Sequence, residues 1–450
     1  MLDSVYQSVK PDYFGVEKEE NDIVVFRTRL RPSKTLAAAL FRNCAGTRRV
    51  YNHVLQMQKE RHEIFAAARK KFFEDNPKKK KKDFKPTEKE KPFSAYDLKK
   101  VLPLLKAVEE TSWLAELDSQ ILQESVLNFG KTWTRFTKKI SGYPRFRNRD
   151  QHNGFGRANG NKAKLIDGKR FKLSKVGWVK MYEEPNPKVS EETQYLIDNG
   201  KLDLSIPSSY VVSLNANKWW ISIRWQVPKT IILPREGDSV GIDLGVSKWG
   251  TTSKGDFIGR SDEIEKKLTN LLKRKDFYYR QLSRRPKQKN EEGKKTSGSN
   301  REKTKRKLAK VWNKIAEIKR NYSHHSSKEL STKFAKIALE ELKIQKMVKS
   351  AKGTVEEPGK KVKQKTNLNR SINQQNWYQF RSMLEYKMTR NGGKVELVDP
   401  QNTSRMCSKC GHVDEKNRKT QSEFKCLNCG HEENADLNAA RNIHRIAFGE

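Results

Sequence analysis

The four cysteines near the C-terminus constrain the fold of this chain more than any other feature. They are spaced as C-x2-C-x15-C-x2-C. A CxxC pair in a tight turn aims two sulfur atoms at one point, and two such turns complete the tetrahedron of a zinc ion, with Zn–S distances of about 2.3 Å. Because four thiolates leave no open coordination position, we expect a structural zinc, with His412 and His431 at the surface rather than among the ligands. The predicted ligands are Cys407, Cys410, Cys426 and Cys429.

The compartment expected for the chain is a reducing cytosol. The first residues, MLDSVYQSVKPDYFG, lack the apolar core of a signal peptide, and no run approaches the ~20 apolar residues of a membrane span. Under reducing conditions paired cysteines favour a metal over disulfides. The fifth cysteine, Cys44, shares an apolar helical face with Ala37, Leu40 and Phe41, which indicates a place in the core.

The charge of the chain predicts a polyanionic partner. Its 450 residues include 94 Lys and Arg against 54 Asp and Glu, a formal net charge of +40. Cations that neutralise phosphates release condensed counterions, so nucleic acid is the natural partner, and an anionic membrane surface is the alternative. The length allows about two to four domains.

The pattern of the first half predicts a strand, then helices, then further strands. Residues 23–30 alternate as a strand does, and helical periodicity begins near Ser33. Residues 74–92 hold five consecutive lysines and three prolines, so we expect a disordered connector there. From about 150 to 233 the pattern favours strands, most clearly KWWISIRWQV, in which Trp219 and Trp225 are expected in the core. A helix after residue 112 is predicted by a stripe formed by Leu122, Val126, Phe129, Trp133 and Phe136.

Two basic helices are predicted in the second half, around 260–284 and 301–337. Residues 301–320 carry nine Lys or Arg against two acids, a bias that suggests a track for phosphates. The segments 285–300 and 350–370 are polar and are expected to be flexible. The apolar stripe of the second helix consists of Leu308, Val311, Trp312, Ile315 and Ile318.

Three acids stand at places where sheets and helices position catalytic carboxylates. Asp243 ends a predicted strand in SVGIDLGV, Glu340 ends the apolar run FAKIALE, and Asp436 opens the helix ADLNAARNIHRI. Taken alone, GIDLG also opens actin-like and Hsp70-like ATPases, Glu340 also fits a solvated strand end, and Asp436 also fits an acid favoured by a helix dipole. Acids so far apart in sequence meet only if a sheet brings them together.

These motifs resemble a known family. GIDLGV, IALEEL, DPQNTSRMCSKCGH and CLNCGHEENADLNAARNI are similar to the RuvC-type nuclease of the TnpB family, transposon-encoded RNA-guided DNA endonucleases that compact type V CRISPR effectors closely resemble. The similarity is dense from about 238 to 446 and weaker before 238. In this family the zinc ribbon interrupts a ribonuclease H-like fold just before its last acid.

The resemblance implies a site. It implies that Asp243, Glu340 and Asp436 are the catalytic acids, although this chain has Glu340-Glu341 where the family usually has Glu-Asp. These carboxylates would hold Mg²⁺, two ions in all, around a scissile phosphate, because Mg²⁺ prefers oxygen ligands. Arg441 is expected to support the charge that builds on that phosphate.

The resemblance also implies a fold class and a domain order. The fold class is an α+β multidomain protein, in which an N-terminal β-barrel wedge with an inserted helical lobe precedes a RuvC (ribonuclease H-like) α/β domain interrupted by a zinc ribbon. The expected boundaries are 1–34 and 143–233 for the wedge, 35–142 for the helical lobe, 234–405 and 431–450 for the nuclease, and 406–430 for the ribbon.

The expected partners are a guide RNA and target DNA, double- and single-stranded. We expect the protein not to associate with a membrane and to be a monomer. Its expected location is the cytoplasm of a prokaryote, in association with the nucleoid.

Four other functions fit parts of the sequence. An RNA-guided repressor would bind target DNA without cleaving it, but all three acids are present. A compact type V CRISPR effector nuclease differs in genomic context rather than in chemistry. An actin-like ATPase would need further phosphate loops and leaves the ribbon unexplained, and a transposase proper would carry out strand transfer.

Overall fold

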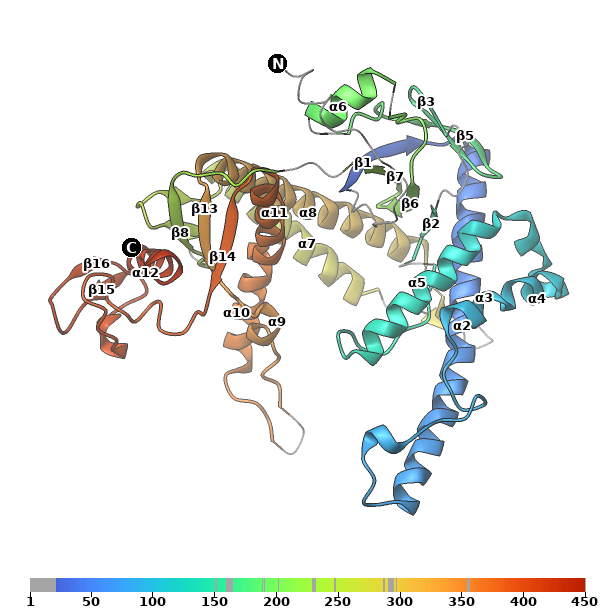
Figure 1. The fold of residues 1–450 in the computed structure, drawn as a ribbon, viewed down its shortest axis with the longest axis horizontal. Helices are drawn as coiled ribbons and strands as arrows, with labels where there is room; N and C mark the ends of the chain where they lie inside the picture. Colours follow the sequence, from blue (N-terminus) through green and yellow to red (C-terminus); the bar gives the residue numbers. More distant parts are fainter. Residues whose placement is uncertain are drawn as a thin grey trace, which may run out of the picture. The chain divides into compact units, whose positions relative to one another are not determined.

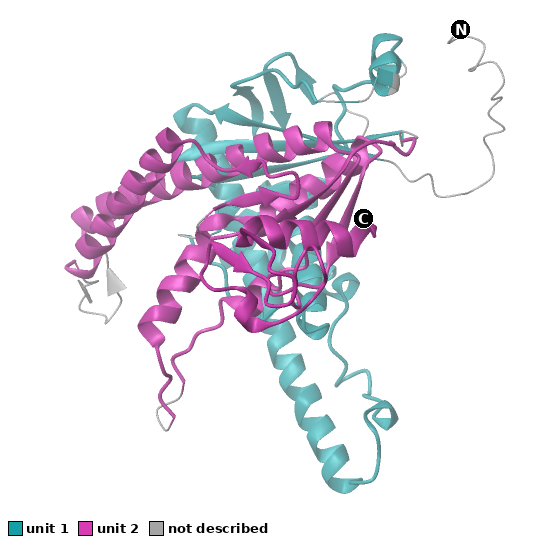
Figure 2. Cartoon of the chain, turned by 90° about the vertical axis from the view of Figure 1, so that its left-hand side faces the viewer, with its two compact units in different colours: residues 1–230 teal, residues 231–450 magenta. Residues whose placement is uncertain are grey.

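A computed structural model describes residues 22–149, 152–158, 165–187, 189, 191–200, 202–228, 232–246, 248–285, 288–289, 295–296, 298–353 and 357–449. The chain forms two compact units, Met1–Thr230 and Ile231–Glu450 (Figure 2). Helices and strands occur in both, so the expected α+β multidomain class is confirmed. No helix of the described part combines the length and the apolar run that a membrane crossing requires.

The first unit combines a sheet with a group of helices (Figure 1). Its strands are β1 (Asp22–Arg31), β2 (Gly154–Ala158), β3 (Ile166–Asp167), β4 (Arg170–Leu173), β5 (Gly177–Met181), β6 (Ser209–Asn215) and β7 (Lys218–Val227). Its helices are α2 (Lys34–Asp75), η1 (Lys81–Asp83), α3 (Ala95–Lys99), α4 (Val101–Ala107), η2 (Glu109–Glu116), α5 (Ser119–Thr137) and α6 (Glu191–Asp198).

The sheet of the first unit is antiparallel, in the order β2-β6-β7-β1-β5-β4-β3. β6 and β7 meet through a hairpin turn in which Ala216 and Asn217 have positive φ, as the twist of a two-residue hairpin requires. Alternate residues of β7 are buried, which confirms Trp219 and Trp225 as core residues. Among the described strands β2 and β3 each have one neighbour, so these pairings leave two edges rather than a closed barrel.

The helices of the first unit pack through the faces that the sequence predicts. Ser33 caps α2, and Cys44 is buried among residues of the sheet. The stripe on α5 is buried at its first four positions, while Phe136 is partly buried. The segment 74–92 begins within the last turn of α2 and contains η1, where the side chain of Asp83 accepts a hydrogen bond from the backbone N–H of Lys80.

The second unit contains a mixed sheet, long helices and two short hairpins. Its strands are β8 (Ser239–Asp243), β9 (Gly250–Thr252), β10 (Phe257–Ile258), β11 (Gln288–Lys289), β12 (Lys295–Thr296), β13 (Lys336–Glu340), β14 (Lys394–Val398), β15 (Glu423–Lys425) and β16 (Glu432–Asn434). Its helices are α7 (Asp262–Ser283), α8 (Ser299–Lys333), α9 (Ile344–Met347), α10 (Val362–Gln375), α11 (Trp377–Arg390), η3 (Glu415–Asn417) and α12 (Ala435–Phe448).

The main sheet of the second unit has the order β10-β9-β8-β13-β14, with β8, β13 and β14 parallel and β9 antiparallel to β8. Because strand side chains alternate, the sheet has two chemically different faces. One face, with Val240, Ile242, Ile337 and Leu339, packs with side chains of α8 and α11 such as Phe334 and Phe380. The other face carries α12, which packs along β8.

The basic helices α7 and α8 pack side by side. Leu308, Val311 and Ile315 of the predicted stripe are buried, but Trp312 is 43 % exposed, so its assignment to the core stripe is wrong. The indole Nε1 of Trp312 donates to the hydroxyl of Tyr279 at 3.1 Å, and the ammonium of Lys275 lies 5.4 Å from the ring centroid. Trp312 is therefore an outer contact between the two helices.

Candidate active site and metal centre

Two of the predicted acids end neighbouring strands. Ile242 of β8 and Leu339 of β13 are partners in a parallel pair, and Asp243 and Glu340 are the next residues of these strands. Neighbouring strands lie about 4.8 Å apart and their side chains alternate in step, so both carboxylates point to the same face of the sheet. That face is the one covered by α12.

The third acid lies at the start of the helix that covers this face. Asn434 caps α12, its side chain accepting from the N–H groups of Asp436 and Leu437, which fixes the first turn. The helix can approach the strand because β8 carries Gly241: a Cβ there would lie 2.3 Å from the carbonyl oxygen of Ala440 and 2.5 Å from the nitrogen of His444. This approach brings Asp436 to the end of the strand that carries Asp243.

The electrostatics of Asp243 reflect this convergence. Burial, together with the charges of Glu340 and Asp436, raises the pKa of Asp243 to about 7. Burial also raises the pKa of Glu340, while Thr403 and Arg418 act in the opposite direction. A half-buried group of like charges favours either a proton or a cation. The site is therefore suited to a divalent cation with oxygen ligands.

Arg418 is a residue of this site that the sequence reasoning missed. It lies in the loop between the two cysteine pairs, its Nη2 atom is 3.7 Å from Oδ1 of Asp436, and its charge lowers the pKa of Asp243 and of Glu340. The same guanidinium donates to the carbonyl of Gln421 at 2.9 Å. In sequence it is one of 94 basic residues, and only its place between the predicted ligand pairs distinguished it.

A buried hydrogen-bond chain holds the second acid. The hydroxyl of Thr403 donates to Oε1 of Glu340, and the carbonyl of Thr403 accepts at 2.9 Å from the side chain of Asn442 on α12. Asn442 is fully buried and also donates to the carbonyl of Met406 at 2.6 Å. The segment that follows β14 is thus fastened to α12, and it positions the carboxylate of Glu340.

The four cysteines form a tetrahedral cluster of sulfur atoms. All four Sγ atoms lie within 4.8 Å of one another, which makes this the one such group of potential ligands among the described residues. Cys407 lies 3.7 Å from Cys429 and Cys410 lies 3.6 Å from Cys426, whereas a disulfide would need about 2.05 Å. A tetrahedron with Zn–S bonds of about 2.3 Å has edges of about 3.8 Å, so the cluster fits Zn²⁺.

The two CxxC turns have the same backbone design. In each, the glycine after the pair has positive φ (76° for Gly411, 70° for Gly430) and donates to the carbonyl of the first cysteine. The N–H of that first cysteine donates in turn to the carbonyl of the following histidine. The backbone N–H of His412 and hydrogen bonds from the other thiols lower the pKa of the Cys410 thiol to about 6, which favours its thiolate. Desolvation and the hydrogen bonds shared within the cluster raise the pKa of the Cys407 and Cys429 thiols.

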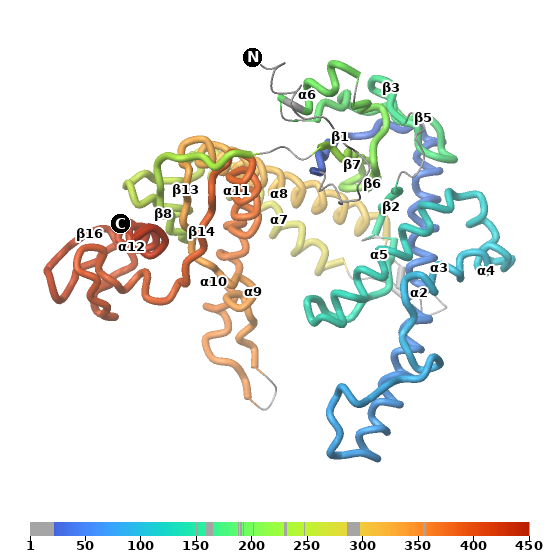
Figure 3. The backbone as a smooth tube through the Cα atoms, viewed as in Figure 1, coloured from blue at the N-terminus to red at the C-terminus, as the bar shows by residue number. Residues whose placement is uncertain are grey.

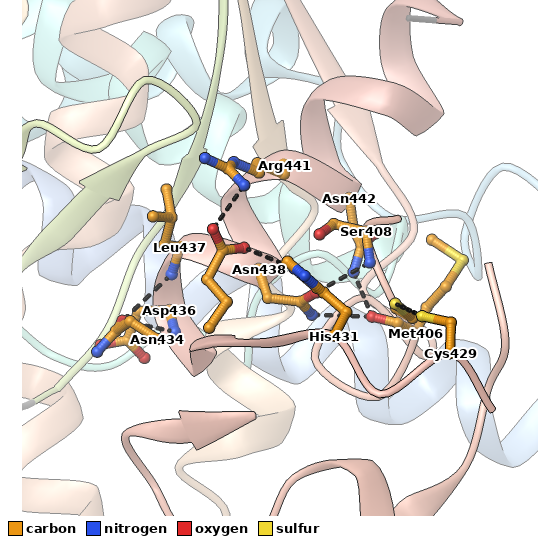
Figure 4. Close-up of polar contacts among 12 residues, drawn as sticks. Met406, Ser408, Cys429, His431, Asn434, Asp436, Leu437, Asn438, Arg441 and Asn442 are labelled. Carbon is orange, nitrogen blue, oxygen red and sulfur yellow. Dashed lines mark hydrogen bonds and ion pairs between the residues drawn. The ribbon is translucent and has the colours of Figure 1, made fainter. Parts of the chain in front are cut away.

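The cluster is tied to α12 by side chains that Figure 4 shows. The buried side chain of Asn438 accepts from the N–H of Ser408 at 2.9 Å and donates to the carbonyl of Met406 at 2.8 Å, on either side of Cys407. After the second cysteine pair, β16 leads directly into α12 (Figure 3). The cysteine cluster and Asp436 therefore belong to one connected structure.

Arg441 lies apart from the acids. Its guanidinium pairs with Glu433 at 2.5 Å, and Glu433 also lies 3.6 Å from Nε2 of His431 (Figure 4). We expected Arg441 to face the acid group, but it points elsewhere. At 100° per residue, a residue five positions after Asp436 lies on another flank of the helix. Arg418 takes the position beside the acids.

His431 is only partly exposed, with its Nε2 atom buried, so the expected surface position is wrong for this atom.

Two family profiles match parts of the chain. The one described as "Probable transposase" matches residues 222–351, which include Asp243 and Glu340. The one described as "Cas12f1-like, TNB domain" matches residues 377–443, which include the four cysteines and Asp436.

Individual relatives match over longer spans. InsQ of Escherichia coli (strain K12) is named as an RNA-guided DNA endonuclease. It is 32 % identical to this chain over 418 residues, which cover 93 % of this chain and 90 % of InsQ. A CRISPR-associated endodeoxyribonuclease Cas12f1 of Sulfoacidibacillus thermotolerans is 31 % identical over 244 residues, half of each chain. A solved structure titled "Cryo-EM structure of the Cas12f1-sgRNA-target DNA complex" covers 94 % of this chain and 99 % of its own at 15 % identity, with a TM-score of 0.46.

We predict that Asp243→Asn stabilises the protein in magnesium-free buffer in a pH-dependent way. Since the folded-state pKa of Asp243, about 7, exceeds its ordinary value of 3.8, its contribution to stability is full below pH 3.8 and is lost as the pH rises through 7. The variant should exceed the wild type in free energy of unfolding by about 2–4 kcal/mol at pH 8, less at pH 5, and not at all near pH 4.

Urea denaturation with zinc retained and no chelator measures this difference. Glu317→Gln, which removes an exposed carboxylate of α8, is the control and should follow the wild-type pH profile. An equal difference at pH 5 and pH 8 would contradict a raised pKa.

We also predict that Gly241→Ala displaces α12. The added methyl would meet backbone atoms of Ala440 and His444 at under 3 Å, so the variant should lose about 2 kcal/mol or more of stability and move Asp436. Gly250→Ala on the adjacent strand is the matched control, because its Cβ would make ordinary contacts at 3.5–3.6 Å. Thermal unfolding compares the two, and equal melting temperatures would refute the close approach.

Proposed function

The chain belongs to the TnpB family of RNA-guided DNA endonucleases, and from this membership we propose that it cleaves target DNA, under the direction of a guide RNA, by metal-dependent phosphodiester hydrolysis. The observation that carries the proposal is the convergence of three carboxylates. Two of them end adjacent parallel strands, and the third opens the helix packed across those strands.

The second unit is proposed to be the RuvC-type nuclease, with a ribonuclease H-like sheet. Its strand order and the parallel central strands support this assignment. Residues 234–405 and 431–450 form the nuclease in this proposal, and residues 406–430 are a zinc ribbon inserted before the last acid. Because the ribbon is inserted next to the last acid, it can contribute Arg418 to the acid group.

We propose that Asp243, Glu340 and Asp436 hold Mg²⁺, and that the four cysteines hold a structural zinc ion. The fit rests on the buried like charges in one site and on the sulfur spacing in the other. Bound between the acids, divalent ions would supply an activated water and stabilise the leaving oxygen.

The side chains of the chain have distinct parts in this reaction. Asp243 has a pKa of about 7, so a bound cation would hold it fully ionised at neutral pH. Thr403 orients Glu340 through its hydroxyl hydrogen bond. Arg418 partly neutralises the acids, and its guanidinium lies where it can support negative charge on a phosphate. Positioning and charge stabilisation are what phosphoryl chemistry requires of a protein.

The first unit is proposed to hold the guide RNA and the target duplex. In this division residues 1–34 and 143–233 form the wedge and residues 35–142 the helical lobe. Base pairing with the guide reads the sequence, so the protein needs shape and backbone charge, which a net charge of +40 supplies. The expected site of action is the cytoplasm of a prokaryote, at its DNA.

A transposase proper is the second candidate, favoured by the profile described as "Probable transposase". Strand transfer by the purified protein would support it, whereas hydrolysis to free ends would support the endonuclease. A binding-only repressor is disfavoured because the three acids are present and electrostatically coupled.

We predict that Asp243→Ala abolishes guided cleavage and leaves guide binding unchanged. The substitution removes a metal ligand at the end of β8 and touches none of the proposed RNA-binding unit. A plasmid-cleavage assay with guide, target and Mg²⁺ should show a loss of about a hundredfold to a thousandfold, roughly what losing one electrostatic stabiliser costs. Guide affinity should equal that of Glu317→Gln, and a parallel loss of RNA binding would contradict the division of labour.

We predict a different defect for Cys426→Ser. Three thiolates hold zinc poorly, so the ribbon should loosen and both Arg418 and Asp436 should lose their places. Bound zinc, measured by a colorimetric chelator, should fall below one equivalent, and cleavage should fall with it. Cys44→Ser, which alters the buried cysteine of the first unit, should retain zinc. Full zinc content in Cys426→Ser would refute the ligand assignment.

A further inference from the structure

A hollow beside α12 begins next to the acid group. It has a volume of about 440 Å³ and is lined by Thr251 and Phe257 from the β9–β10 hairpin and by Asn434 and Leu437 from the start of α12. Thr251 is the strand partner of Asp243, so this hollow adjoins the carboxylates. The ring of Phe257 is 54 % exposed, and the ammonium of Lys248 lies 5.2 Å from its centroid.

A second hollow continues the first along the same flank. It has a volume of about 530 Å³, and its lining includes Lys254, Arg441 and Arg445. Lys254 directly precedes Gly255, which lines the first hollow, and Arg441 lies four residues, about one helical turn, after Leu437. The two hollows are therefore neighbours along α12 and the β9–β10 hairpin, and we refer to them together as the groove.

The far end of the groove carries unbalanced positive charge. Lys254 pairs with Asp238 at 2.5 Å and Arg441 pairs with Glu433 at 2.5 Å, so each of these cations has an acidic neighbour. Arg445 has no ion-pair or hydrogen-bond partner for its guanidinium among the described residues, and one of its Nη atoms lies 3.8 Å from where a Cβ of Gly411 would be. The hydroxyls of Ser239, Ser253 and Ser408 also line this end.

We infer that this groove binds the phosphodiester backbone of the DNA strand being cleaved, with one phosphate at Arg445. A planar guanidinium without a partner, flanked by hydroxyl donors, suits a phosphate. The exposed ring of Phe257 suits a stacked base nearer the acids. Ser239 and Asp243 are four residues apart on β8, about 13 Å, so the phosphate at Arg445 lies a few nucleotides from the scissile bond. The cleavage in this inference rests on the proposed function.

Protection of Lys254 from acylation tests the groove without any cleavage. The zinc-loaded protein, in magnesium-free buffer, is treated with an amine-reactive ester, and mass spectrometry follows the modification of Lys254. Single-stranded DNA of about 20 nucleotides should slow this modification, while a methylphosphonate oligomer of the same base sequence, which lacks the charge, should not. Equal protection by both oligomers, or by neither, overturns the inference.

Arg445→Gln and Arg390→Gln make a matched pair for this assay. Each removes an exposed arginine from the last turn of a 14-residue helix of the same unit, α12 in one case and α11 in the other. The DNA concentration that gives half protection should rise about tenfold in Arg445→Gln, the size expected for a lost charge-assisted hydrogen bond, and stay unchanged in Arg390→Gln. Equal behaviour of the two variants overturns the assignment of Arg445.

A scan of neutral phosphates ties the groove to the strand that is cut. Methylphosphonates placed one at a time along the target DNA should slow guided cleavage by the wild type about tenfold at one position near the scissile bond, and the same substitution should cost Arg445→Gln nothing further. Protection of Lys254 by single-stranded RNA but not by DNA would overturn the assignment to the cleaved strand. Protection by DNA without guided cleavage would refute the endonuclease and support the groove, whereas cleavage without protection would refute the groove.

Discussion

The approach of α12 to β8 at Gly241 is the contact on which the rest of the second unit depends. A side chain at this position would strike the backbone of the helix, so glycine is what allows the helix and the strand to touch. This contact places Asp436 of the helix beside Asp243 of the strand, and the parallel register of β8 and β13 adds Glu340. Three carboxylates in a half-buried place repel one another, and the fold tolerates that repulsion because it also supplies cations.

The ribbon and the acid group are parts of one structure. Asn438 and Asn442, one turn apart on the buried face of α12, hold the segment that precedes the first cysteine pair. The same segment orients Glu340 through Thr403, and the loop between the cysteine pairs supplies Arg418. The cysteine cluster therefore helps to set the geometry of the acid group, although none of its sulfur atoms belongs to that group.

The sequence predicted those features that depend on local pattern or on motif spacing. The alternation of β7 located Trp219 and Trp225, and the spacing of the cysteines located four sulfur atoms that do come together. The sequence failed where tertiary packing decides. Trp312 matched a helical stripe, yet it lies at the rim of the contact between α7 and α8. Arg441 was nearer in sequence to Asp436 than Arg418 was, but the turn of the helix directs Arg441 to Glu433, and a hairpin returns Arg418 to the acids.

The short path from Cys429 to Asp436 has an evolutionary consequence. β16 occupies half of this path, and its last residue, Asn434, already caps α12, so adding or removing a residue there would rotate the acid away from its partners. The loop between the cysteine pairs, in contrast, begins and ends at the cysteine cluster. Homologous chains should therefore vary in length on one side of the second cysteine pair and keep a constant length on the other.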